Sequence, residues 1–366
     1  VQQYVLTLGN WLSSRGHDVH YLAGETRERD LANLHSLSRN VAVRYNHNSM
    51  STPLPANRQK TKSLLNKRKF DLLHVMMPYS PLLAGRIIDQ APESTAIVGT
   101  FHILPYSKAV WLGMLLVATW ENRGLNKFDK ILSVSPAAQV FAKAVFKLES
   151  EVVPNFVTIN RFARARQSYK KEDKLTILFL GRLVPRKGCL TLLRAVKQLL
   201  LSKNLPKFEV VICGAGPLLT SLMKYAKING LSKIVKFVGY VPEEEKPARL
   251  ASADIAVFPS SGGESFGIVL IEAMASGKSV VLAGRNPGYE SVLGGQPELL
   301  FDASDVDELA KKLEHYILDA NLRKEHADWC RHRAIEFDVD RVGPSIERIY
   351  KQVADSKKVQ HNLSHA

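Results

Sequence analysis

Short apolar runs alternate with amphipathic helical stretches along almost the whole chain. The runs are rich in Val, Ile and Leu with little polar alternation, which is typical of parallel strands buried on both faces. Their alternation with helices predicts an α/β fold with doubly wound sheets. Apolar side chains at helical spacing over residues 1–12 predict that the chain opens in a helix. The predicted strands are 18–23, 41–45, 71–76, 96–102, 130–135, 151–154, 175–181, 208–214, 235–241, 255–260 and 279–284.

A polar, basic and weakly patterned stretch separates these strands into two sets, and we interpret residues 158–174 as a linker. A chain of 366 residues favours two domains, here 1–157 and 175–343. A C-terminal helix near 344–366 is a candidate to pack back on the first domain. Because α/β sheets normally start with a strand and the first helix has none before it, we expect the first strand to precede residue 1.

Two carboxylates eight positions apart stand in the run GGESFGIVLIEAMASG, residues 262–277. Glu264 lies in a glycine-rich turn after a predicted strand, and Glu272 interrupts an otherwise apolar helix. The N-terminus of that helix is a ready anion site, because its first N–H groups are unpaired. A nucleotide sugar could place its diphosphate there and a hydroxyl-rich group at each carboxylate. The alternative is that Glu272 only faces solvent.

A second candidate site is LGRLVPRKG, residues 180–188, between a predicted strand and a helix. Arg182, Arg186 and Lys187 follow the carboxyl end of the strand, where open α/β sheets bind ligands. These cations could neutralise a departing diphosphate. The alternative is an ordinary solvated basic loop.

The formal net charge of +15 suits a partner that carries many negative charges. Residues 31–70 contain no Asp or Glu, and no aromatic RNA-binding signature accompanies their basic residues, so an anionic membrane is favoured over nucleic acid. No apolar stretch is long enough to span a bilayer; the longest candidate is 109–120. The expected membrane-contact residues are Arg58, Lys60, Lys62, Lys67, Arg68 and Lys69.

Other chemistries find little support in the sequence. The G-x-G of residues 214–216 lacks the third glycine and the acidic partner of a nicotinamide-binding fingerprint. The three cysteines are far apart and predict neither a disulfide framework nor a zinc site. We expect no metal site and no cofactor. His102 ends an apolar strand, and its interpretation is open between a structural and a functional histidine.

G-R-x-x-x-R-K-G at 181–188, G-x-G-P at 214–217 and the E-x7-E run together resemble glycosyltransferase family 4. The T-F-H strand end and R-Y-N at 44–46 are similar to the bacterial phosphatidylinositol mannosyltransferases of that family. The resemblance implies a retaining, metal-independent hexosyltransferase of the GT-B fold, with two Rossmann-like domains facing a cleft. The donor would be a nucleotide sugar.

The resemblance also implies roles for individual positions. Arg182 and Lys187 would hold the donor diphosphate, Glu264 would bind the transferred sugar, and Glu272 would bind the ribose. The expected donor-binding residues are Arg182, Lys187, Val241, Glu243, Lys246, Glu264, Phe266, Gly267, Ile268 and Glu272. The expected catalytic residues are His102, Glu264, Arg182 and Lys187.

Asn46 and Arg186 would touch a phosphoinositol-like acceptor. The predicted function is transfer of mannose from GDP-mannose to a lipid-linked acceptor such as phosphatidylinositol, by a cytoplasmic enzyme bound peripherally at the inner face of the cell membrane. Two alternatives stay open: a soluble family 4 glucosyl- or N-acetylglucosaminyltransferase that uses a UDP-sugar, and a catalytically silent nucleotide-sugar-binding module.

Overall fold

The structure is a computed structural model of residues 1–366, and it describes all of them except 27–30, 46–47, 79, 81, 106–110, 116–123, 169–173, 203 and 365–366. Within residues 42–52 only the backbone is described. The chain forms two compact units. The first unit contains Val1–Asn155 and Val339–Ala366, and the second unit contains Phe156–Asp338.

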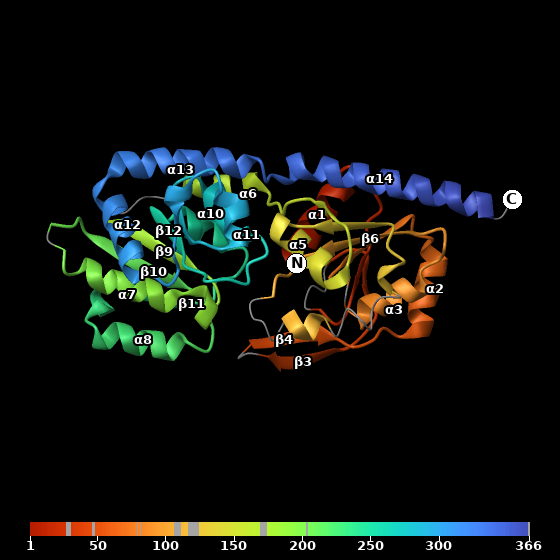
Figure 1. Ribbon diagram of the computed structural model, residues 1–366, viewed down its shortest axis with the longest axis horizontal. Coiled ribbons are helices and arrows are strands. Elements are labelled where there is room, and N and C mark those ends of the chain that lie inside the picture. The colour runs from red at the N-terminus through yellow and green to blue at the C-terminus, as the bar shows by residue number, and fades with distance from the viewer. Residues whose placement is uncertain are drawn as a thin grey trace. The chain divides into compact units, whose positions relative to one another are not determined.

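The second unit is built on a six-stranded sheet with the order β11-β10-β9-β12-β13-β14, in which every pairing is parallel (Figure 1). All residues of β9, β12 and β13 are buried, as their continuous apolar sequences predict. The strands are β9 (Leu175–Leu180), β10 (Phe208–Cys213), β11 (Val235–Gly239), β12 (Ile255–Phe258), β13 (Val280–Gly284) and β14 (Leu300–Phe301).

The strand order reverses between β9 and β12, because the chain continues from β9 to β10 on one side and reaches β12 on the other. In open α/β sheets ligands bind outside the carboxyl ends of the strands at this switch point. The helices are α6 (Ile159–Ser168), α7 (Cys189–Leu199), α8 (Leu219–Ile228), α9 (Lys246–Ala251), α10 (Ile268–Ser276), α11 (Pro287–Leu293), α12 (Val306–Leu318) and α13 (Ala320–Ile335). Three 3₁₀ turns complete the unit: η1 (Pro185–Lys187), η2 (Leu231–Lys233) and η3 (Pro297–Leu299).

The first unit contains a four-stranded parallel sheet with the order β5-β6-β7-β8, a parallel pair β1-β2 and an antiparallel pair β3-β4. Its strands are β1 (Tyr21–Ala23), β2 (Leu34–Ser36), β3 (Asn40–Tyr45), β4 (Asn48–Pro53), β5 (Leu72–Met76), β6 (Ala96–Phe101), β7 (Lys130–Ser133) and β8 (Glu151–Val152). Its helices are α1 (Gln2–Ser14), α2 (Arg58–Arg68), α3 (Leu83–Gln90), α5 (Pro136–Phe146) and α14 (Val339–Ser364).

Helix α14 belongs to the first unit because it packs on α1. The Trp11 indole N–H donates to Asp340 Oδ1 at 2.8 Å, and Arg15 pairs with Glu347 at 2.8 Å. An added Cβ at Gly343 would lie 2.8 Å from the Trp11 ring, so the absence of a side chain there lets the helices approach closely. The C-terminal segment is thus part of the core around α1.

The predicted α/β class and all of the predicted strands are confirmed. Three strands were not predicted, namely β2, β4 and β14. β3 is not a parallel strand but one arm of an antiparallel hairpin. The expected linker 158–174 holds helix α6 in its described part, and the apolar segment 109–120 lies largely outside the described residues.

No helix within the described ranges is long and apolar enough to cross a membrane. In the same part of the chain, His, Cys, Asp and Glu side chains form no group of three or more that could hold a metal ion.

Candidate functional site

Two loops of the second unit follow the carboxyl ends of β9 and β12 at the switch point. The first, 181–188, carries the three predicted cations and ends at Gly188, whose φ of 72° is left-handed. A Cβ at Gly188 would lie 1.9 Å from the Pro259 carbonyl oxygen, in the second loop. Glycine is therefore required where the two loops meet.

The glycines of the G-x-G run at residues 214–216 also permit close approaches between backbones. A Cβ at Gly214 would lie 1.8 Å from the Gly181 carbonyl oxygen, and one at Gly216 would lie 2.4 Å from the Leu183 carbonyl oxygen. The main chains also exchange hydrogen bonds, since the Leu183 N–H donates to the Ala215 carbonyl at 2.9 Å. These glycines hold the cationic loop in position.

Glu264 lies at the centre of an ion-pair cluster in the second loop. Its Oε1 accepts from the Arg186 guanidinium, from Lys187 Nζ at 2.9 Å and from Ser260 Oγ at 2.8 Å. The Glu264 side chain is only 12% exposed. A Cβ at Gly288, in α11, would lie 2.1 Å from the Glu264 carbonyl oxygen, so α11 packs tightly against the main chain that carries this carboxylate.

The two cations determine the ionisation of Glu264. Burial alone would raise the pKa of this carboxyl, but Lys187 and Arg186 outweigh burial and hold its pKa below the usual value. Burial lowers the pKa of Lys187, and Glu264 opposes that shift. The Glu264 carboxylate is therefore ionised near neutral pH.

Glu272 is the fifth residue of α10 and only 4% exposed, so the alternative in which it faces solvent is wrong. Lys246 Nζ lies 3.1 Å from Glu272 Oε1 and 2.7 Å from Glu243 Oε1. Arg161 of α6 donates to the Glu243 carbonyl and lies 3.9 Å from its carboxylate. Burial raises the pKa of Glu272, and Lys246 opposes that shift. A buried carboxylate of this kind needs a partner at all times.

Helix α10 begins at Ile268, and its N-cap, Gly267, makes no side-chain capping bond. A Cβ at Gly267 would lie 2.7 Å from the Tyr289 ring. The buried Phe266 ring packs edge-on against Phe337 with ring centroids 5.5 Å apart. Tyr289 and Phe337 thus pack against the two residues that precede α10, which begins four residues after Glu264.

His102 belongs to the first unit, directly after β6, and it is only 8% exposed. Its Nε2 lies 3.1 Å from Met76 Sδ, and its ring packs edge-on against Tyr4 with centroids 4.7 Å apart. Burial, followed by the N-terminal amine and His74, lowers the pKa of His102 well below its usual value. The imidazole is therefore neutral, which suits a group that exchanges hydrogen bonds with hydroxyls.

The structure brings Arg186, Lys187 and Glu264 together, and Glu243, Lys246 and Glu272 together. Arg182 is exposed beside the first group, and Val241 is partly exposed beside the second. Asn46 lies outside the described residues. The six predicted membrane-contact residues are all exposed on or next to α2.

Three neighbours of these carboxylates were not predicted: Ser260, Tyr289 and Arg161. Ser260 Oγ donates to Glu264, and Gly267 rests against the Tyr289 ring. In the sequence Ser260 stands at the end of the apolar run 255–260, four residues before Glu264. Only this position could have indicated that Ser260 contacts Glu264. Nothing in the sequence indicates that Arg161, which lies in the expected linker, reaches Glu243.

In comparison with known proteins, both parts of the chain match glycosyltransferase families. Residues 1–161 match the family described as Glycosyltransferase Family 4, and residues 161–332 match Glycosyl transferases group 1. A phosphatidyl-myo-inositol mannosyltransferase of Mycolicibacterium smegmatis is 31% identical over 97% of this chain and 90% of its own length. The chain belongs to glycosyltransferase family 4.

A further M. smegmatis relative of this glycosyltransferase is a GDP-mannose-dependent alpha-(1-6)-phosphatidylinositol monomannoside mannosyltransferase, 34% identical over 79% of this chain and 78% of its own. A solved glycosyltransferase from Rickettsia africae superposes with a TM-score of 0.76 at 17% identity, covering 96% of this chain and 94% of that one. Sucrose-phosphate synthase from Thermosynechococcus elongatus gives 0.74 at 21% identity over 96% and 93%. These structures confirm the expected GT-B class, with two Rossmann-like units.

The ion pairs of Glu264 predict a pH-dependent loss of stability in Glu264→Gln. The pKa of Glu264 is lower in the folded protein than in the unfolded chain, so its contribution is complete above the unfolded pKa of ~4.3 and disappears as the pH falls through the folded pKa. Urea denaturation at pH 7 should show a loss of about 3–5 kcal/mol, as expected when one partner of a buried pair is removed.

The matched control is Glu290→Gln, since Glu290 is 44% exposed and lies 3.9 Å from Arg285. Its loss should stay below about 1 kcal/mol. The difference between Glu264→Gln and the unmodified protein should shrink at pH 3. An equal difference at pH 3 and pH 7, or a loss no larger than that of the control, would contradict an ionised Glu264 held by Lys187 and Arg186.

Proposed function

We propose that this glycosyltransferase moves a hexose, mannose from GDP-mannose, to a lipid-linked acceptor such as phosphatidylinositol, with retention at the anomeric carbon. The names of the mycobacterial relatives support the donor and the acceptor. The observation that carries the proposal is the cluster around Glu264 at the switch point of the second unit.

The cluster has a charge that suits a diphosphate. Arg182, Arg186 and Lys187 contribute three cations and Glu264 one carboxylate, so the net charge is 3 − 1 = +2. A donor diphosphate would take over these cations, assisted by the N-terminus of α10. As the bond between sugar and diphosphate breaks, the same groups would stabilise the negative charge on the leaving group.

The arrival of the diphosphate would also change the partners of Glu264. In the structure Arg186 and Lys187 both pair with its Oε1. Once the diphosphate attracts these cations, Glu264 can accept hydrogen bonds from the hydroxyls of the transferred sugar. Arg186 thereby connects donor binding with the position of Glu264. Arg186 and Asn46 are also proposed to contact the acceptor. His102 is proposed to contact the sugar from the first unit.

The nucleoside would bind at the second carboxylate. Glu272 Oε1 is held by Lys246, and the same lysine pairs with Glu243 two residues after Val241. Ribose hydroxyls would donate to the Glu272 carboxylate, while Val241, Glu243 and Lys246 would lie against the base. Because side chains and a helix terminus supply the positive charge, the proposed reaction requires no metal ion.

The ribose role predicts that Glu272→Ala weakens GDP binding at least about ten-fold, since hydrogen bonds to charged groups are worth about 1.5–3 kcal/mol. Titration calorimetry with GDP measures this affinity. Glu244→Ala is the matched control, because Glu244 is exposed in the same segment. Its affinity for GDP should equal that of the unmodified protein, while Glu264→Ala should lower turnover more than GDP affinity.

An unchanged GDP affinity in Glu272→Ala, with the variant folded, would remove the ribose role. Titration with UDP-glucose separates the proposed function from a UDP-sugar enzyme: GDP-mannose should bind more tightly. A preference for UDP-glucose would replace the proposed donor.

A lipid acceptor makes membrane docking useful, and helix α2 has the surface for it. Its buried side chains are Thr61 and Leu65, and it packs on α3, while its basic residues point to solvent. Within the described residues none of these cations forms an ion pair. Each cation near an anionic surface contributes ~1 kcal/mol to binding. We therefore propose peripheral attachment at the inner face of the cell membrane through Arg58, Lys60, Lys62, Lys67, Arg68 and Lys69.

The membrane proposal predicts that the protein co-sediments with phosphatidylglycerol vesicles at low salt and is released at high salt. A variant with four of the cations neutralised should lose most of this binding; the substitutions are Lys60→Gln, Lys62→Gln, Lys67→Gln and Arg68→Gln. The control neutralises four exposed lysines of the second unit and should bind nearly as well; its substitutions are Lys224→Gln, Lys227→Gln, Lys311→Gln and Lys324→Gln. Equal binding of both variants, or equal binding to neutral vesicles, would rule out docking through α2.

A further inference from the structure

Arg161 lies in the first turn of α6, and the proposed reaction assigns it no role. Its guanidinium donates a hydrogen bond to the main-chain carbonyl of Glu243, 82 residues later in the chain. The same nitrogen, Nη2, lies 3.9 Å from Glu243 Oε2. One arginine thus contacts both the backbone and the carboxylate of a residue in the proposed nucleoside site.

The Glu243 carbonyl needs a donor from outside its own segment. In an α-helix each carbonyl accepts from the N–H four residues later, and the residue four positions after Glu243 is Pro247, which has no N–H. The Lys246 N–H donates to the Pro242 carbonyl at 3.1 Å instead. Arg161 therefore supplies a hydrogen bond that the helix cannot make, at the point where α9 begins.

The contact continues through Lys246 to the buried Glu272. Lys246 Nζ lies 2.7 Å from Glu243 Oε1 and 3.1 Å from Glu272 Oε1. Glu243 Oε2 is buried and accepts no hydrogen bond within the described residues, so the Arg161 cation beside it is its electrostatic partner. These four side chains carry two positive and two negative formal charges, which cancel.

Helix packing fixes the position of Arg161 relative to this group. α6 packs against both α9 and α10, which carry Lys246 and Glu272, and it lies beside α10 in Figure 1. The next residue, Phe162, is buried and anchors α6. The Arg161 side chain is itself 37% exposed, so its replacement would remove the contacts with Glu243 without leaving a cavity in the core.

We propose that Arg161 is a positioning residue for nucleotide binding, an inference that rests on the ribose role proposed for Glu272. Arg161 does not touch the nucleotide. It holds the segment 242–246 in place, so that Lys246 stays between its two carboxylates and Glu272 keeps one orientation toward the ribose hydroxyls. Without Arg161 the formal charge of the group becomes −1, and a nucleotide with a negatively charged diphosphate would meet repulsion.

The electrostatics of Glu272 agree with this role. Burial raises the pKa of the Glu272 carboxyl, and Lys246 and then Arg161 oppose that shift, while Glu243 adds to it. Loss of Arg161 removes one opposing cation and releases the segment that carries the other. The pKa of Glu272 should therefore rise further, and a protonated carboxyl accepts fewer hydrogen bonds from ribose hydroxyls.

The first arm of the experiment contains no nucleotide. The Glu272 carboxyl of the 366-residue chain is titrated by carbon NMR, with Glu272→Gln to assign its signal. In Arg161→Gln we expect this carboxyl to titrate at a higher pH than in the unmodified protein. The matched control is Arg164→Gln, since Arg164 is exposed on the same helix, and its titration should be unchanged. An unchanged titration in Arg161→Gln would overturn the inference.

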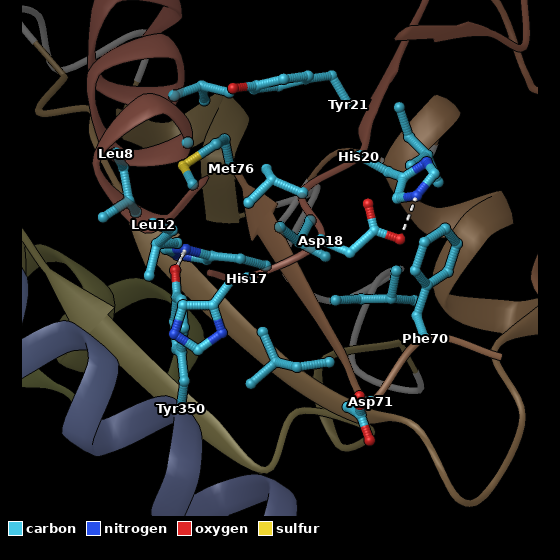
Figure 2. Close-up of a pocket in the computed structure, with 18 of the residues that line it drawn as sticks. Leu8, Leu12, His17, Asp18, His20, Tyr21, Phe70, Asp71, Met76 and Tyr350 are labelled. Carbon is cyan, nitrogen blue, oxygen red and sulfur yellow. Dashed lines mark hydrogen bonds and ion pairs between the residues drawn. The ribbon is translucent and has the colours of Figure 1, made fainter. Parts of the chain in front are cut away.

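The same NMR signal reports where a nucleotide binds. The first unit contains a cavity, and Figure 2 shows Leu8, Tyr21, Met76 and Tyr350 among the side chains around it. All the residues that line this cavity belong to the first unit. GDP bound there would leave the Glu272 signal in place, whereas GDP at the proposed site should shift it. Binding of GDP without such a shift would also overturn the inference.

The second arm is a double-mutant cycle, read as GDP affinity by titration calorimetry. Arg161→Gln should weaken GDP binding by on the order of ten-fold, and it should leave the binding of pyrophosphate, which has no ribose, unchanged. Because Arg161 acts through Glu272, the double variant should bind GDP as weakly as Glu272→Ala alone. Additive losses, or an equal loss for pyrophosphate, would make Arg161 a general cation and overturn its positioning role.

The two arms separate failure of the inference from failure of the proposed function. If Glu272→Ala weakens GDP binding and Arg161→Gln does not, the role of Arg161 is overturned while the ribose role of Glu272 stands. If Glu272→Ala leaves GDP affinity unchanged, the ribose role is lost, and the positioning role of Arg161 is overturned with it.

Discussion

The organisation of the second unit depends on one shared carboxylate oxygen. Glu264 Oε1 accepts from Arg186, Lys187 and Ser260, which come from the loops after two adjacent strands. Without Glu264, cations would be crowded at the switch point with no anion beside them. The glycines at 188, 214 and 288 allow the close backbone approaches that hold these loops together. Glu264 thus neutralises one of the positive charges that these loops bring together.

This arrangement keeps the charges of a buried site paired within the protein, at a site proposed to bind a highly charged ligand. In the proposed reaction a diphosphate would replace Glu264 as the anion between Arg186 and Lys187, and Glu264 would become available to the sugar. Glu272 is paired in the same way, since Lys246 satisfies its carboxylate inside an apolar helix, and the proposed ribose hydroxyls would bind to that carboxylate. Both carboxylates of the E-x7-E run are therefore paired in the described structure, each by a lysine from another segment.

The sequence predicted the sheets well because buried parallel strands are continuous apolar runs. It failed where that signal is absent: β4 is the polar segment NSMSTP, and β2 and β14 are too short to show a period. The spacing of Glu264 and Glu272 predicted that both carboxylates belong to one ligand site. Their partners could not be predicted, because the Lys246–Glu272 contact depends on how the β11–α9 connection folds back on α10. The proximity of Arg186 to Glu264 likewise follows from the adjacency of β9 and β12.

The most direct test of the account is sugar transfer itself. The purified protein is incubated with radiolabelled GDP-mannose and phosphatidylinositol in vesicles, with and without EDTA, and the lipid fraction is analysed for the label. We expect a mannosylated lipid in the α configuration of the donor, at a rate that EDTA leaves unchanged. Label transfer that requires a metal ion, or transfer from UDP-glucose in preference to GDP-mannose, would contradict it.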